Sequence, residues 1–156
     1  MPKTLKKRID KTLKGHFDTE LVQMEPIIIP EDLSNKLPES FLTERLFRLI
    51  NDDNELGYAY VGKAPSLSEY FDFMVIFNRD LMVVHSKVLI YREDYGGEIG
   101  SKRWLRQFEG ASPGQAFIIN HDIMAISGAT ISVNAMTLAI NELLDCFKTL
   151  SENNVL

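Results

Sequence analysis

The sequence predicts an α+β fold, in which an antiparallel sheet of two β-hairpins packs against helices. Aromatic and β-branched residues gather between residues 46 and 91, short turn sequences divide this region, and apolar residues recur at helical spacing towards both ends of the chain. With 156 residues, 45% of them hydrophobic, the chain can bury one core. Within this compact unit, we place an N-terminal helix and wrapping segment at residues 1–40 and the main domain at residues 41–156.

The N-terminal part is predicted to cover the sheet. Leu5, Ile9 and Leu13 recur every four residues, which predicts a helix over residues 3–14. The next segment, residues 20–38, carries several prolines and ends in polar turn formers. Because proline cannot donate a hydrogen bond to a neighbouring strand, we expect a surface loop or an edge strand there.

Two hairpins account for the predicted sheet. Residues 46–50, the turn sequence NDDNE and the strand GYAYVG form the first hairpin. Residues 70–77 and 81–91 form the second, since the short link Asn78-Arg79-Asp80 favours antiparallel pairing.

The last third of the chain is predicted to be mainly helical. The loop YGGEIG leads to a short helix over residues 101–110, with Ser101 as N-cap and Gly110 as the stop. A short strand near residues 116–119 precedes a long helix from about residue 132 to residue 150. Its predicted buried face comprises Ala135, Leu138, Ala139, Leu143, Cys146, Phe147 and Leu150.

Composition excludes several function classes. The net charge of -5 and the pI near 5.2 argue against nucleic-acid binding, which needs clustered Lys and Arg. Cys146 is the single cysteine, so it has no partner for an internal disulfide and is assigned to packing. His85 and His121 lack neighbours with metal-ligand spacing, and we predict no metal site. Without a signal peptide or spanning segment, the chain is expected to be soluble: cytoplasmic as it stands, extracytoplasmic if an anchor precedes it.

The sharpest local pattern is ISGATIS, residues 126–132, where a loop meets the last helix. Gly128 and Ala129 leave the backbone nearly bare, so an anion can approach the free N–H groups of the first helical turn. The hydroxyls of Ser127, Thr130 and Ser132 add donors, and each is also a possible oxygen for a phosphoester. The pattern therefore predicts a phosphate site, although these letters alone also suit an ordinary helix cap.

Four ordered elements extend this pattern: GYAYVG, REDYGGEIG, WLRQFEG and ISGATISVNAMTLAINELL. In order and spacing, they resemble the FMN-binding domain of the flavinylated subunits of sodium-translocating NADH:quinone reductase and the related Rnf electron-transfer complexes. The resemblance covers about residues 46–144. It implies an FMN-binding domain-like fold and a flavoprotein that transfers electrons.

The resemblance also implies roles for particular residues. FMN would be joined through its phosphate to Thr130, with Ser127, Gly128 and Ala129 lining the phosphate pocket. Glu93, Gly96 and Gly97 resemble a loop beside the flavin ring, although EDYGGEIG is longer than the common ETPGLG. The implied partners are a redox protein or a membrane electron-transfer complex, and a flavin transferase if the bond forms.

One departure leaves the attachment open. The transferase of this family prefers an acidic residue three positions before SGAT, where this chain has Met124; Asp122 lies two residues earlier. Covalent attachment and binding by contacts alone both stay open as ways of holding FMN. Two further alternatives stay open: a degenerate structural or partner-binding domain without flavin, and a small flavin-dependent reductase. Whether the chain is an enzyme is left undecided.

Overall fold

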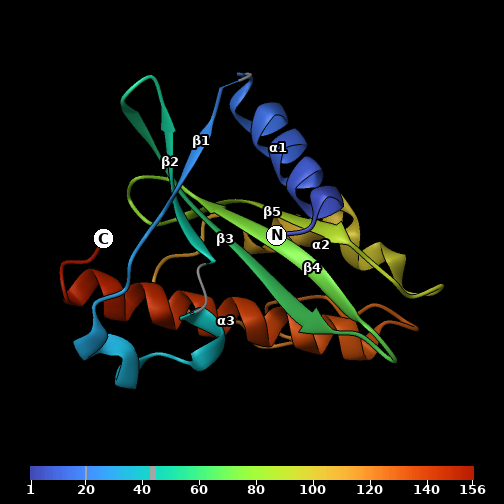
Figure 1. The fold of residues 1–156 in the computed structure, drawn as a ribbon. Coiled ribbons are helices and arrows are strands. Elements are labelled where there is room, and N and C mark those ends of the chain that lie inside the picture. Colours follow the sequence, from blue (N-terminus) through green and yellow to red (C-terminus); the bar gives the residue numbers. More distant parts are fainter. Residues whose placement is uncertain (20, 43–44) are drawn as a thin grey trace.

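The computed structural model describes residues 1–19, 21–42 and 45–156 (Figure 1). Within these ranges the predicted α+β class is confirmed: five antiparallel strands lie in the order β1-β2-β3-β4-β5, with helices on both faces. The strands are β1 Gln23–Pro26, β2 Leu46–Asn51, β3 Asn54–Pro65, β4 Tyr70–Phe77 and β5 Val83–Ile90. The α-helices are α1 Lys3–Phe17, α2 Lys102–Leu105 and α3 Thr130–Glu152; the 3₁₀ helices are η1 Glu31–Lys36, η2 Glu39–Phe41, η3 Gly97–Gly100 and η4 Arg106–Phe108.

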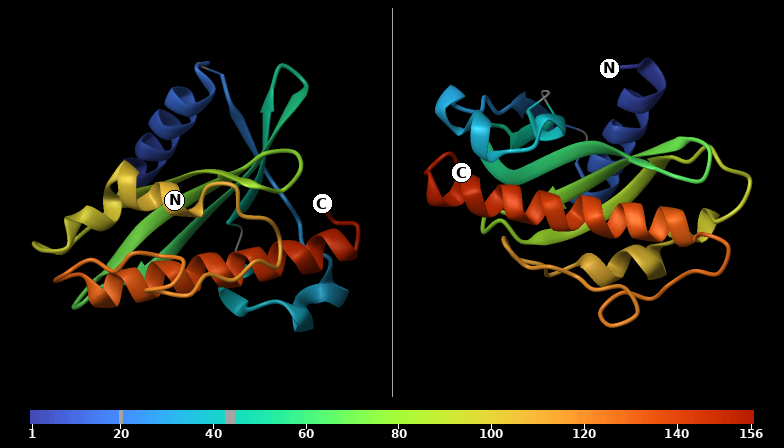
Figure 2. Two further views of the ribbon diagram at one scale, coloured as in Figure 1. Left: turned by 180° about the vertical axis from the view of Figure 1, so that it is seen from behind. Right: turned by 90° about the horizontal axis from the view of Figure 1, so that it is seen from below.

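Strand β4 determines how the molecule is layered. Seven of its eight residues are buried, and successive side chains point to opposite faces of the sheet. Phe73 and Val75 enter the core on the α3 side, whereas Met74 and Ile76 enter a second core on the α1 side. The sheet therefore needs cover on both faces, and Figure 2 shows α3 and α1 providing it from opposite sides.

Both predicted hairpins are present, and the sheet extends beyond them. Asp52 and Asp53 have positive φ angles of 47° and 68°, as the tight turn between β2 and β3 requires. Strand β1, which ends in Pro26, pairs with β2 at the sheet edge, as the edge-strand prediction required. The first residue of the predicted wrapping segment, Glu20, lies outside the described residues, as do residues 43–44 of the predicted main domain. The division at residue 41 stays a prediction.

The link between β4 and β5 is longer than predicted. The Asn78 side-chain oxygen accepts hydrogen bonds from the N–H groups of Asp80 and Met82, both at 3.0 Å. Leu81 adopts a left-handed conformation, with a φ of 65°. This asparagine-centred turn occupies the first two positions of the predicted strand, so β5 begins at Val83.

The long helix α3 is confirmed, but its buried face is rotated from the predicted one. Phe147 is fully buried and stacks on Phe77 of β4 at 3.9 Å between ring centroids. Leu138, predicted as buried, is 66% exposed and was wrongly assigned. The side chains of α3 that are buried are Ser132, Val133, Met136, Thr137, Ile140, Leu143, Leu144, Cys146, Phe147 and Leu150. They recur at intervals of three and four residues, and Leu138 lies outside this stripe.

The strand predicted near residues 116–119 is not formed. Phe117 donates its N–H to the Asn141 side chain at 2.8 Å and accepts a bond from the same amide at 3.0 Å. One amide side chain on α3 thus satisfies the backbone groups that a neighbouring strand would have paired. The short helix after Ser101 is confirmed with its cap, because the Ser101 hydroxyl accepts a bond from the N–H of Trp104.

Removing the Phe147 ring tests how α3 is held on the sheet. Because this ring is fully buried against Phe77, Phe147→Ala should lower the free energy of unfolding by about 3–5 kcal/mol. Urea denaturation followed by circular dichroism measures the change.

Leu138→Ala on the same helix is the matched control. This side chain is mostly exposed, so the substitution should change the unfolding free energy by less than about 0.5 kcal/mol. Equal losses in the two variants would contradict the rotated face described above.

Candidate functional site

Helix α3 starts with free backbone donors. Ala129 occupies the cap position, no side chain caps the helix, and its first turn has no acidic residue. The first N–H to find an acceptor within the helix is that of Val133, which bonds to the Ala129 carbonyl at 2.9 Å. In the described chain, no residue accepts from the N–H groups of residues 130–132. Three donors and the positive end of a 23-residue helix are therefore available to an anion.

A tight turn keeps the approach to these donors open. Ala129 donates its N–H to the carbonyl of Ile126 at 3.1 Å, which closes a four-residue turn. Gly128, third in that turn, has a φ of 81°, a conformation that side-chain-bearing residues rarely adopt. A Cβ atom built on Gly128 would meet no protein atom within 4 Å, so the space beside it is free.

The loop after β5 lies directly against the start of α3. A Cβ atom on Gly96 would come within 2.8 Å of the Ala129 Cβ and 3.0 Å of the Tyr91 hydroxyl. That hydroxyl also lies 3.0 Å from the Ser132 hydroxyl and donates to the carbonyl of Tyr95 at 3.1 Å. Two sequence-predicted segments, separated by some 30 residues in the chain, are thereby brought together.

A surface cavity of about 530 Å³ lies at this junction. Three segments line it: residues 67–69 before β4, residues 91–95 after β5, and residues 128–132 at the start of α3. Leu67 and Tyr95 are 76% and 83% exposed, unusual values for large apolar side chains. The volume falls within the range of small-molecule sites, and the apolar walls would lose contact with water when a ring system binds.

Glu93 joins two walls of this cavity. Its carboxylate accepts hydrogen bonds from the Ser68 N–H at 3.0 Å and from the Ser68 hydroxyl at 2.7 Å. The segment before β4 is thus fixed to the segment after β5. The Glu93 carboxylate is committed to this contact, while the free N–H groups of α3 lie on another wall of the cavity.

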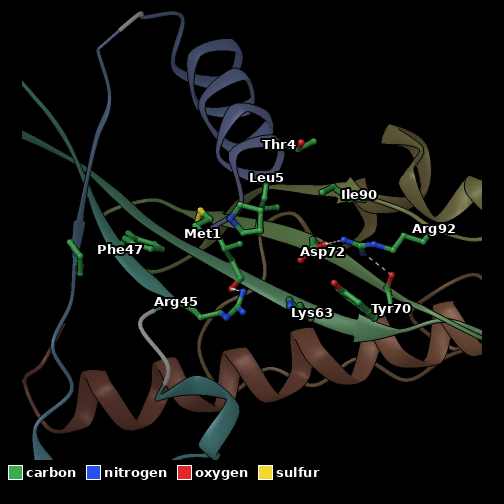
Figure 3. Close-up of a pocket in the computed structure, with 13 residues that line it drawn as sticks. Met1, Thr4, Leu5, Arg45, Phe47, Lys63, Tyr70, Asp72, Ile90 and Arg92 are labelled. Carbon is green, nitrogen blue, oxygen red and sulfur yellow. Dashed lines mark hydrogen bonds and ion pairs between the residues drawn. The ribbon is translucent and has the colours of Figure 1, made fainter.

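Arg92 separates this cavity from an adjoining pocket between α1 and the sheet, which Figure 3 shows. Its guanidinium lies 2.7 Å from the buried carboxylate of Asp72, donates to the Tyr70 carbonyl, and covers the Tyr70 ring at 4.0 Å. Breaking such a buried pair leaves an uncompensated charge, so this pair fixes the wall between the candidate site and the adjoining pocket.

The predicted site residues fall into two groups. Gly128, Ala129, Thr130, Ser132 and Glu93 line the cavity. Ser127 is exposed in the turn outside the lining; Gly97 begins η3 with open space around it, also outside the lining; Gly96 contributes through Ala129.

Sequence reasoning missed the eight other lining residues: Leu67, Ser68, Glu69, Tyr91, Arg92, Asp94, Tyr95 and Ile131. A signal for all but Ile131 existed in the predicted second hairpin. Because its strands are antiparallel, the residues before the first strand and after the second must meet at one end of the sheet.

The comparisons agree with this geometry. A family profile described as the FMN-binding domain matches residues 67–145, which include all three segments that line the cavity. The chain belongs to this family, and FMN is its cofactor. A comparison with curated proteins found no match.

Three further features of the chain bear on its function: its metal-ligating side chains, its cysteine and the character of its helices. In the described part of the chain, no three His, Cys, Asp or Glu side chains come together as a metal site requires. Burial raises the pKa of the Cys146 thiol to about 12, so this cysteine is an inert core residue. No α-helix within residues 1–19, 21–42 and 45–156 has the length and apolar character needed to cross a bilayer.

Gly96→Ala tests the close contact at this junction. A methyl group at 2.8 Å from the Ala129 Cβ should push the start of α3 away from the loop, in addition to the cost of about 1–2 kcal/mol for a positive φ. FMN affinity should fall roughly tenfold or more, measured by quenching of flavin fluorescence on titration with protein.

Gly110→Ala provides the control for backbone strain. Gly110 has a φ of 87°, but a Cβ atom there would meet nothing within 4 Å, and the residue lies outside the cavity lining. This variant should be less stable and bind FMN normally. Matching FMN affinities in the two variants would show that the contact with Ala129 does not shape the site.

Proposed function

We propose that this domain is an electron-transfer flavoprotein that holds the FMN phosphate at the start of α3. The observation that carries the proposal is a set of three N–H groups, at residues 130–132, that have no acceptor among the described residues and lie at a cavity within the family match. A dianionic phosphate satisfies such donors and interacts favourably with the helix dipole. Bound FMN supplies the capacity to accept and release electrons.

Different residues of the cavity suit the phosphate end and the ring end of FMN. The open side of Gly128 leaves room for a phosphate oxygen close to the backbone. Leu67 and Tyr95 offer exposed apolar surface for the flavin ring. The hydrogen bonds between Glu93 and Ser68 hold the segment of Leu67 and the segment of Tyr95 at a fixed separation. The flavin ring would therefore enter a cavity that is already formed.

An electron carrier fits this site better than a stand-alone enzyme. The lining includes exposed side chains on all three segments, so one edge of a bound ring would remain accessible to a protein partner. The resemblance to the quinone reductase and Rnf subunits makes a redox protein or a membrane electron-transfer complex the proposed partner. One measurement distinguishes an electron carrier from a flavin-dependent reductase. NADH alone, without another protein, would bleach the flavin absorbance of a reductase.

Thr130 is the proposed acceptor for covalent attachment. Among the three candidate hydroxyls, Thr130 alone is both exposed and part of the cavity lining. Ser127 lies outside the lining, and the Ser132 hydroxyl is buried against Tyr91. The bond would be a phosphoester between Thr130 Oγ1 and the FMN phosphate, formed by a flavin transferase.

Met124 bears on whether the transferase recognises the chain. Its backbone is fixed from two sides, since its carbonyl accepts from Trp104 and its N–H donates to Gln107, both at 2.7 Å. The side chain is 62% exposed, so an enzyme can reach it. Asp122 lies in a turn, and its carboxylate accepts a hydrogen bond from the Ile118 N–H at 2.8 Å. We therefore expect Asp122 to be a poor substitute for the preferred acidic residue.

A comparison of FMN with riboflavin tests the phosphate site. Riboflavin lacks the phosphate, so the unmodified wild-type protein should bind FMN at least about tenfold more tightly, by isothermal titration. In Gly128→Val, side-chain bulk beside the free N–H groups should remove most of this preference. Gly110→Val is the control for strain at a positive φ and should retain the preference. Equal affinities for the two flavins in the wild type would argue against a phosphate site at α3.

Intact mass tests the covalent bond. Coexpression with a flavin transferase should add the mass of FMN less one water, and Thr130→Val should abolish the adduct because it keeps the branched shape without the hydroxyl. Met124→Asp restores the acidic residue at an exposed position and should increase the modified fraction.

Two outcomes would contradict this assignment. An adduct that persists in Thr130→Val places the bond on another side chain. No adduct even in Met124→Asp means that FMN is held by contacts alone.

A further inference from the structure

A second cavity, of about 650 Å³, is lined by residues of α1, of the edge strand β5 and of the segment that carries α2 and η4. It shares no lining residue with the candidate flavin cavity. Neither the family match nor the proposed electron transfer accounts for it.

Positive charge is concentrated around this cavity. Although the chain carries a net charge of -5, its lining contains Arg8, Lys11, Lys87, Lys102 and Arg106, opposed there only by Glu109. Arg8 donates to the Leu89 carbonyl. Among the described residues, the four other cations have no ion-pair partner. Like charges held together in this way repel one another unless an anion lies between them.

Two imidazole rings form part of the same lining. His16 of α1 and His85 of β5 stack at 5.2 Å, with 25° between their planes. Burial lowers the pKa of both rings, and the positive groups of His16, Lys87 and Lys102 lower that of His85 further, while Glu109 acts in the opposite direction on His16. At neutral pH the stacked pair is therefore a mainly uncharged, flat surface beside the cations.

Ser86 adds a polar group that the fold leaves unused. This residue lines the cavity and is 4% exposed, and its hydroxyl has no hydrogen-bond partner among the described residues. Buried hydroxyls are rarely left without a partner, because their desolvation is then uncompensated. Its side chain is closed to solvent and points to the opposite face of β5 from His85 and Lys87, so it is not counted among the groups that contact a ligand.

We propose that this cavity binds a small organic diphosphate, with its phosphates held by Lys87, Lys102 and Arg106. The unpaired cations call for several negative charges. The site is concave and is built from α1, β5 and the segment from η3 to Glu109, which favours a compact molecule over a flat macromolecular surface. The stacked imidazoles offer a face for a planar group on the same ligand.

Inorganic pyrophosphate is the probe for the charge-binding part of the site. It should be added at constant ionic strength to the full-length, FMN-loaded protein, and the histidine ring signals followed by NMR. Saturable binding should shift the signals of His16 and His85 and raise the pKa of both, because a nearby anion stabilises the protonated ring. His121, the third histidine of the chain, lies outside the cavity lining, and its signals should not move.

Charge reversal separates site binding from general attraction. Lys102→Glu and Arg106→Glu should each weaken pyrophosphate binding about tenfold or more, whereas Lys36→Glu, an exposed change of equal charge on η1, should have little effect. The candidate flavin cavity contains none of these residues, so FMN content should be unchanged in all three variants.

Three results would overturn the proposal. They are an absence of saturable shifts at His16 and His85, equal shifts at His121, or equal weakening in Lys36→Glu. A short poly-glutamate peptide that binds here more tightly than pyrophosphate would also overturn it, since the occupant would then be an acidic protein segment.

Discussion

The alternation of side chains along β4 is the constraint on which the other elements depend. With aromatic rings directed to one face and Met74 and Ile76 to the other, neither face of the sheet can remain in water. Helix α3 must cover one face and α1 the other. Once both helices are placed, the ends of the β4–β5 hairpin lie beside the start of α3, and the edge of β5 lies between α1 and α2. Both cavities follow from this arrangement.

The start of α3 lacks the side chains that usually stabilise a helix end, and its backbone N–H groups stay accessible to a ligand. A long helix ordinarily gains from a side-chain cap and an acidic first turn, and this helix has neither. Its position is fixed instead by contacts with the segment that follows β5: Ser132 bonds to Tyr91, and Ala129 packs against Gly96. Because neighbouring segments supply the fixation, the N–H groups of the first turn stay free. An added cap would satisfy the same donors and compete with a phosphate for them.

Much of this could be predicted from sequence because the signals were local. The hairpins follow from alternation and turn residues, the helix cap at Ser101 from one hydroxyl, and the SGAT segment from its small residues. The errors arose where a distant partner decided the outcome. Asn141 replaces a strand partner for Phe117, and packing of Phe147 on Phe77 selects the face of α3 that excludes Leu138. The bond between Glu93 and Ser68 joins residues 25 positions apart, and no local pattern predicts it.

Positive charge is distributed differently around the candidate flavin cavity and the second cavity. Around the candidate flavin cavity, Arg92 is paired with Asp72, Glu93 is bonded to Ser68, and the free positive groups are the dipolar N–H ends of α3. Around the second cavity, the positive groups are full charges on Lys and Arg side chains. Partial charges from a helix end suit one phosphate held close to the backbone, whereas several charged side chains suit a ligand with more negative charge. Strand β5 contributes residues to the second cavity, and the segment that follows it contributes to the first. One edge strand therefore borders both proposed anion sites, which differ in the charge of the ligand that they would select.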